Sequence, residues 1–109
     1  MKWEFVYYSE RVQKDIHSMP SGLRHEFYAM RKIMEENGPA LGMPFTRAMS
    51  NGLFEMRIRD KTGIARVFYC TVTQSEIMVL HSFIKKTQQT PDRELSIARK
   101  RLKEVQHHG

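Results

Sequence analysis

Two segments in the second half of the chain carry basic and aromatic side chains at alternating positions. Residues 53–59 read LFEMRIR, and residues 76–86 read EIMVLHSFIKK. Both have the β-branched and aromatic composition of strands, so successive side chains should point to opposite faces of a sheet. A third segment of this kind, IARVFYCTV at residues 64–72, lies between them. Short turns join the three segments, so they predict an antiparallel meander.

The alternation predicts one apolar face and one cationic face of this sheet. The rows expected beneath helices are Phe54, Met56 and Ile58; Ala65, Val67 and Tyr69; and Met78, Leu80 and Ile84. The opposite face then carries Arg57, Arg59, Arg66, Phe68, His81, Phe83 and Lys85, with Val79 beside them and Glu55 as its one carboxylate.

A face of this composition suits single-stranded RNA, because basic groups hold phosphates and aromatic rings stack on unpaired bases. It also suits phosphodiester cleavage, in which fixed cations stabilise the negative charge that grows on the phosphoryl oxygens. Such a reaction needs a general base and a general acid, and His81, Glu55 and a lysine of lowered pKa are the candidates. The pattern also fits an ordinary polar face, since exposed antiparallel sheet faces are normally polar.

The other elements follow from apolar spacing and from turn residues. In chain order we expect a strand at 2–8, helices at about 10–18 and at 22–36, an irregular segment at 38–52, the three strands above, and a helix beginning at Pro91. The order β-α-α-β-β-β-α predicts an α+β fold, with helices packed on one face of a mainly antiparallel sheet.

The totals limit the classes of protein that the chain can represent. Its 109 residues suffice for a single domain at 1–109, in which residues 106–109 are expected to form a disordered tail. The net charge of +6 predicts a polyanionic partner. A single cysteine, Cys70, excludes an internal disulfide and disfavours a cysteine-based metal site. No stretch is apolar enough for a membrane span, so we expect a cytoplasmic protein. We also expect no cofactor.

The segment from residue 53 to residue 105 resembles the RelE/ParE toxin superfamily of type II toxin–antitoxin systems, and within it the HigB-like, phage-derived branch. The matching segments are LFEMRIR (53–59), GIARVFYCTV (63–72), IMVLHSFIKKTQQTP (77–91) and RELSIARKRLKE (93–104). A strand that ends in H-x-F-x-K-K before a helix capped by Thr-Pro is the most specific of these features. The first strand and the two-helix hairpin agree in order and length.

The resemblance implies a RelE-like fold and a ribosome-dependent endoribonuclease that cuts mRNA in the ribosomal A site. It implies metal-free catalysis by basic side chains. It also implies a cognate antitoxin, often a small helix-turn-helix protein, that neutralises the toxin.

Carried over by position, the resemblance assigns roles to individual residues. Arg57 matches the arginine of an E-x-R strand motif, and Arg66 matches that of an R-V-F-Y strand and is the expected transition-state stabiliser. Phe83 would stack on a base, and Lys85 would contact phosphate or act as an acid. Lys86 alternates to the other face, so its RNA contact is less direct.

The remaining candidates come from the predicted face itself. His81 is the candidate for proton transfer, and Glu55 is expected to anchor Arg57 or Arg66 by a salt bridge. Arg59 and Phe68 complete the expected RNA-binding set.

Two other functions fit the sequence. ParE-like members of the superfamily share the fold but inhibit DNA gyrase, and fold does not decide function. A non-enzymatic basic domain that binds nucleic acid or protein is the other alternative.

Overall fold

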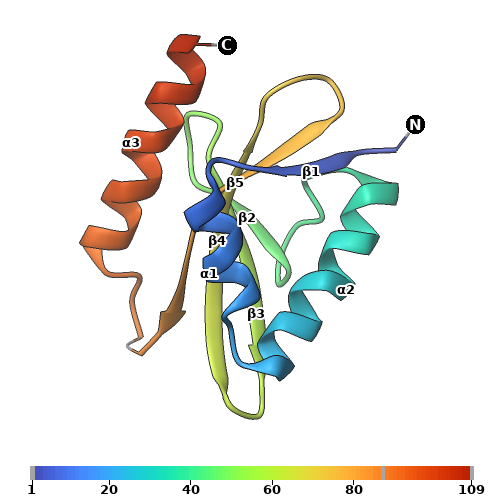
Figure 1. The fold of residues 1–109 in the computed structure, drawn as a ribbon, viewed down its shortest axis with the longest axis vertical. Helices are drawn as coiled ribbons and strands as arrows, with labels where there is room; N and C mark the ends of the chain where they lie inside the picture. Colours follow the sequence, from blue (N-terminus) through green and yellow to red (C-terminus); the bar gives the residue numbers. More distant parts are fainter. Residues whose placement is uncertain (1, 87, 109) are drawn as a thin grey trace.

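The computed structural model describes residues 2–86 and 88–108, and shows three helices around one five-stranded sheet (Figure 1). In chain order the elements are β1 (Glu4–Tyr7), α1 (Glu10–His17), α2 (Ser21–Asn37), β2 (Thr46–Ala48), β3 (Phe54–Asp60), β4 (Gly63–Thr71), β5 (Glu76–Lys85) and α3 (Asp92–His108). The predicted α+β class and element order are confirmed, with one added strand. This strand, β2, lies in the segment at 38–52 that was expected to be irregular.

The sheet has the strand order β1-β5-β4-β3-β2. The first strand pairs parallel with β5, and all other neighbours are antiparallel. The long first connection, through two helices, takes the chain from β1 at one edge of the sheet to β2 at the other edge. The central meander β3-β4-β5 is therefore flanked on both sides by short strands.

Local signals in the sequence set the helix ends. The side chain of Ser9 caps α1, because its Oγ accepts a hydrogen bond from the Val12 N–H at 3.2 Å. Gly38 ends α2 with a φ of 93°, a conformation that glycine adopts without a steric penalty. Leu23, Phe27 and Met34 form the buried side of α2.

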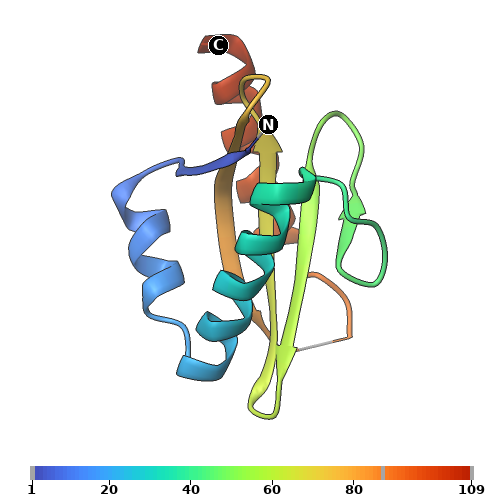
Figure 2. The same cartoon turned by 90° about the vertical axis from the view of Figure 1, so that its right-hand side faces the viewer.

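Helices α1 and α2 cover one face of the sheet (Figure 2). Their apolar side chains pack with Met56 and Ile58 of β3 and with Ala65, Val67 and Tyr69 of β4. These rows are the ones predicted to lie beneath helices.

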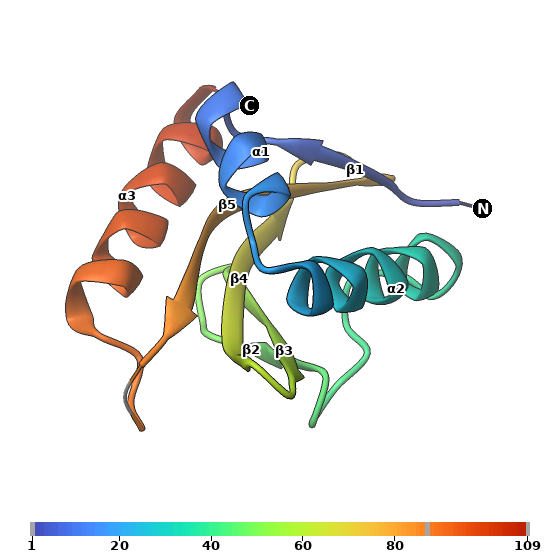
Figure 3. The same ribbon diagram turned by 60° about the horizontal axis from the view of Figure 1, so that its bottom comes forward.

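The third helix lies on the opposite face, so the expectation that all helices share one face is wrong. Ala98 and Leu102 of α3 pack against Phe68, Cys70 and Leu80. Figure 3 shows α3 and α2 on opposite sides of the sheet. Arg101 tethers α3 further, because its Nη1 donates a hydrogen bond to the Leu80 carbonyl at 2.7 Å.

A β-bulge between β4 and β5 explains a second difference. The register shifts at Phe68/Tyr69, where Phe68 pairs with His81 but Tyr69 pairs with Val79. Leu80 is the extra residue, and an extra residue reverses the alternation of the strand on one side of it. Val79 therefore packs with the α1/α2 layer, and Leu80, with Met78, packs with α3. Both assignments reverse the sequence prediction, whereas His81, Phe83 and Lys85 keep the predicted face.

The C-terminal segment is helical where a tail was expected. Helix α3 continues through His108, so residues 106–108 extend it, and residue 109 lies outside the described residues. Within the described part of the chain, no helix is both long and apolar enough to cross a membrane.

Candidate active site

The sheet face beneath α3 has an uncovered half, and most of the predicted basic residues lie there. Strand pairing sets them in two adjacent rows across β3, β4 and β5. The first row is Arg57, Arg66 and Phe83, and the second is Arg59, Ile64 and Lys85. The row of Glu55, Phe68 and His81 separates them from the half that α3 covers.

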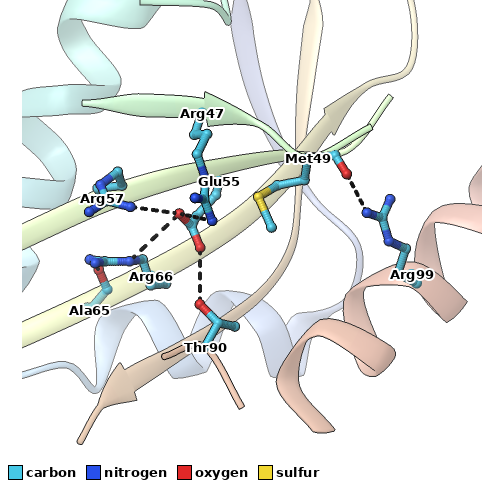
Figure 4. Close-up of polar contacts among 8 residues, drawn as sticks. All are labelled: Arg47, Met49, Glu55, Arg57, Ala65, Arg66, Thr90 and Arg99. Carbon is cyan, nitrogen blue, oxygen red and sulfur yellow. Dashed lines mark hydrogen bonds and ion pairs between the residues drawn. The ribbon is translucent and has the colours of Figure 1, made fainter. Parts of the chain in front are cut away.

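Glu55 is fully buried and lies among three guanidinium groups (Figure 4). Its Oε1 lies 3.2 Å from Nη1 of Arg57, 3.6 Å from Nη2 of Arg47 and 3.8 Å from Nε of Arg66. Its Oε2 accepts a hydrogen bond from the Thr90 hydroxyl at 3.4 Å. These are the contacts expected of an orienting carboxylate. We call Glu55, Arg47, Arg57 and Arg66 the guanidinium cluster.

The guanidinium cluster has an excess of positive charge. Three guanidinium groups and one carboxylate leave a net charge of +2. Arg66 is only 5% exposed. Its burial, followed by repulsion from Arg57, lowers its pKa below the ordinary value, although Glu55 opposes this effect. An anion that approached this cluster would gain more from the interaction than one at an isolated surface arginine, because the site is partly desolvated.

Two nitrogen atoms of Arg66 have different partners. Nη1 donates to the Ala65 carbonyl at 3.2 Å. Nε is buried, lies 3.8 Å from the Glu55 carboxylate, and has no hydrogen-bond acceptor among the described residues. Buried donors are normally paired, so this nitrogen is an exception.

Lys85 lies at the edge of the same surface. Partial burial lowers its pKa, and the nearby guanidinium groups of Arg66 and Arg57 lower it further. A lysine with a lowered pKa is a better proton donor at neutral pH than an ordinary lysine. Arg59 and Lys86 are both exposed, Arg59 in the row of Lys85 and Lys86 one residue beyond β5.

The two predicted aromatic residues have different environments. Phe68 is fully buried against α3, so its predicted stacking on RNA is wrong. Phe83 is half-buried and stacks on Phe68 with ring centroids 6.0 Å apart. The His81 ring also stacks on Phe83, with ring centroids 6.3 Å apart. Phe83 therefore presents a ring that is held in place by two other rings.

The structure does not place His81 for proton transfer. Its Nε2 lies 2.6 Å from Oε1 of Glu94 on α3. Its Nδ1 is buried and has no partner among the described residues. The arrangement makes His81 a link between β5 and α3.

Two residues that contact Glu55 were not predicted as site residues from the sequence. Arg47 belongs to β2, which was expected to be irregular, and Thr90 was assigned only a capping role. In the structure, Thr46 is buried while Phe45 and Arg47 beside it are exposed, as in a strand. This burial cannot be read from the sequence, so no local signal marked Arg47.

No metal site accompanies the cluster. Within residues 2–86 and 88–108, no three histidine, cysteine, aspartate or glutamate side chains are grouped so that they could hold a metal ion. Cys70 is buried beneath α3, and burial raises the pKa of its thiol to about 11. A thiol in this state is a packing residue.

Most of the sequence matches a known protein family. The family described as "Phage derived protein Gp49-like (DUF891)" matches residues 14–103, which is most of the chain. The chain belongs to this family. The resemblance to a phage-derived branch is thereby confirmed at the level of the Gp49-like family. No curated protein sequence matches the chain significantly.

A comparison with solved structures agrees with the fold of this Gp49-like chain. The chain is similar to a chain in the crystal structure of the archaeal RelE–RelB complex from Pyrococcus horikoshii OT3. The TM-score is 0.56 and the identity 23%, over 77% of this chain and 96% of that one. The Gp49-like chain therefore has a RelE-like fold.

Proposed function

We propose that this Gp49-like chain is the toxin of a type II toxin–antitoxin system, of the HigB-like branch, and an endoribonuclease that cuts translated mRNA. The guanidinium cluster carries the proposal, because it is a partly desolvated cationic group on an uncovered sheet face. The membership in a phage-derived family and the RelE-like fold agree with it.

The proposed reaction uses the RNA's own nucleophile. The 2′-hydroxyl oxygen attacks the adjacent phosphorus and loses its proton to a base. The bond from phosphorus to the 5′-oxygen breaks, which leaves a 2′,3′-cyclic phosphate, and the 5′-oxygen takes up a proton. Arg57 and Arg66 stabilise the charge on the non-bridging oxygens, and no metal takes part.

The other residues of the site have supporting roles in this proposal. Lys85 donates the proton to the leaving 5′-oxygen, in agreement with its lowered pKa. Phe83 stacks on a base of the bound strand, and Arg47, Arg59 and Lys86 hold flanking phosphates. Glu55 fixes the guanidinium groups.

The biological setting follows from the substrate. Translated mRNA is present in the A site of the ribosome, so the toxin acts in the cytoplasm. The net charge of +6 favours its approach to ribosomal RNA. A cognate antitoxin, such as a small helix-turn-helix protein, restrains it between episodes of activity.

The test compares wild type, Arg66→Ala and Arg11→Ala, each expressed under tight control in bacteria. Arg11 is the matched control, because it is an exposed arginine on α1 whose ion-pair partner is Asp15 in the next helical turn. Primer extension maps the 5′ ends of mRNA. We expect cuts within translated codons for wild type and Arg11→Ala, and a loss of about 100-fold for Arg66→Ala.

Each other outcome points elsewhere. Growth arrest with uncut mRNA would favour gyrase inhibition. Equal cleavage by wild type and Arg66→Ala would exclude the guanidinium cluster as the active site. Normal growth on expression of the wild type would leave a basic binding domain.

A further inference from the structure

Exposed apolar side chains gather beside the candidate active site. Ile33 of α2 is 49% exposed, and Met43 and Phe45, in the segment that leads to β2, are 59% and 50% exposed. Side chains of this size are normally buried in a small domain. An exposed cluster next to a functional site is typical of a surface that a partner covers.

Two hollows run along this cluster and adjoin one another. The first, of about 330 Å³, is lined by Glu26, Ala29, Met30, Ile33, Leu41 and Phe45. The second, of about 300 Å³, is lined by Glu26, Met30, Pro44, Phe45, Arg57, Ile58 and Arg59. They share Glu26, Met30 and Phe45. Together they form a groove between α2 and the segment 41–45, which we call the α2 groove.

The wall of the α2 groove is held firmly by hydrogen bonds. The Gly42 carbonyl accepts bonds from the Phe45 and Thr46 N–H groups, both at 3.0 Å. The Gly42 N–H donates to the Thr46 hydroxyl at 2.8 Å. The Phe45 carbonyl accepts a bond from the Arg57 N–H at 2.9 Å. The exposed position of the Phe45 ring is therefore set by its backbone, and the groove is largely preformed.

The two ends of the α2 groove differ in chemistry. Glu26 borders both hollows. Beyond it, the end at Ile33 and Leu41 is lined by apolar side chains, and the other end reaches Arg57 and Arg59. A single-stranded RNA would leave the apolar end uncovered. A peptide with apolar side chains and a terminal carboxylate would match both ends, because the carboxylate would pair with a guanidinium group.

We infer that the α2 groove is the docking site for a segment of the antitoxin, a peptide with apolar side chains along its length and an acidic residue at the end that meets Arg57. The inference rests on the proposed function, since it assumes that an antitoxin exists. Arg57 belongs to both the groove and the guanidinium cluster. A carboxylate bound there would occupy the position of a substrate phosphate, so the antitoxin would inhibit by direct competition with RNA.

The antitoxin for the test is the product of the genomic fragment that restores growth to cells expressing the wild-type chain. Binding of this purified protein is measured to Ile33→Asp, to Phe45→Asp and to the control Ile84→Asp, all in an Arg66→Ala background that cells tolerate. Ile84 is a matched control, because it is an exposed isoleucine, 38% accessible, outside the groove. Circular dichroism checks that each variant is folded.

We expect both groove variants to bind the antitoxin at least about tenfold more weakly, and Ile84→Asp to bind like its parent. With Arg66 intact, Ile33→Asp should still cut mRNA, but the antitoxin should no longer rescue growth. Equal binding by all variants would overturn the inference and leave the proposed function standing. Loss of cleavage in Ile33→Asp with antitoxin binding retained would also overturn it, because the groove would then bind RNA. Absence of growth arrest by the wild type would instead count against the proposed function itself.

Discussion

The two halves of one sheet face differ in whether a helix covers them. In the half beneath α3, Phe68 and Leu80 pack with Ala98 and Leu102 and are closed to solvent. In the other half, two residues farther along each strand, no helix lies over Arg57 and Arg66; Arg57 is half-buried and Arg66 is buried among its neighbours. Strands β3, β4 and β5 run through both halves, and the bulge at Leu80 lies in the covered half. The difference in exposure comes from the helix that lies over one half and not over the other.

The difference shows how a small domain can combine a core with a charged site. The covered half supplies apolar burial, which is the main source of stability. The uncovered half holds side chains that repel one another and would be unfavourable without Glu55. The boundary row contains Glu55 and His81, and each binds across it, Glu55 to the arginines and His81 to Glu94.

The largest effect should come from the covered half. Phe68→Ala leaves a cavity beneath α3 and should lower the free energy of unfolding by about 4 kcal/mol, measured by urea denaturation. Cleavage by the remaining folded protein should fall only modestly, because Phe83 loses one of the two rings that hold it. If stability were kept and RNA binding lost, the assignment of Phe68 to the core would be wrong.

Glu55→Gln tests the boundary. It should lower the free energy of unfolding by about 3 kcal/mol, because three neighbouring guanidinium groups lose their buried counter-charge. Added sulfate should recover part of the melting temperature by binding to the cluster. The control Glu36→Gln removes an exposed pair with Lys2 and should cost about 0.5 kcal/mol. Equal effects of the two substitutions would show that Glu55 does not hold the cluster together.

His81→Ala tests whether His81 belongs to the covered half of the sheet face or to the active site. It should cost about 1 kcal/mol of stability, through the lost bond to Glu94, and leave the cleavage rate nearly unchanged. Rates are measured on purified ribosomes programmed with a short mRNA. A rate loss of about 100-fold with the fold intact would restore His81 as a proton-transfer residue and move the site under α3.

The smallest effect at neutral pH concerns Lys85. As a proton donor it is active when protonated, so cleavage should decline as the pH rises through its pKa. Because this pKa is lowered, the decline should begin below the ordinary lysine value of about 10.4. Lys85→Arg should move the decline to higher pH, since arginine stays protonated, and pH–rate profiles of the two proteins check this. Identical profiles would exclude Lys85 as the acid.

Alternation along single strands was predictable from the sequence. The shared face of Arg57, Arg66, Phe83 and Lys85 follows from the period of two in each strand, and the structure has it. The bulge at Leu80 was not predictable, because neither its flanking residues nor its composition marks it. The bulge places Val79 and Leu80 on the faces opposite to those predicted. The sequence therefore did not predict the apolar patch on which α3 lies.

Residues that join the site from a distance were also missed. Thr90 lies 35 residues from Glu55 in the sequence, and Arg47 lies on β2, a strand that the sequence did not predict. Only the fold brings both residues to Glu55. The α2 groove is of the same kind, since it needs α2 and the segment 41–45 side by side. No local pattern reports such neighbours.

The sequence alone determined the α+β class, the order of the predicted elements and the row of basic side chains, because backbone geometry and apolar spacing act over a few residues. Tertiary structure decided which of those side chains are chemically available. Phe68 and His81 share a face with Arg66, yet α3 covers Phe68, and Glu94 of α3 binds His81. The exposure of a side chain depends on packing between segments that are distant in the sequence. The alternation of residues along one strand carries no information about that packing.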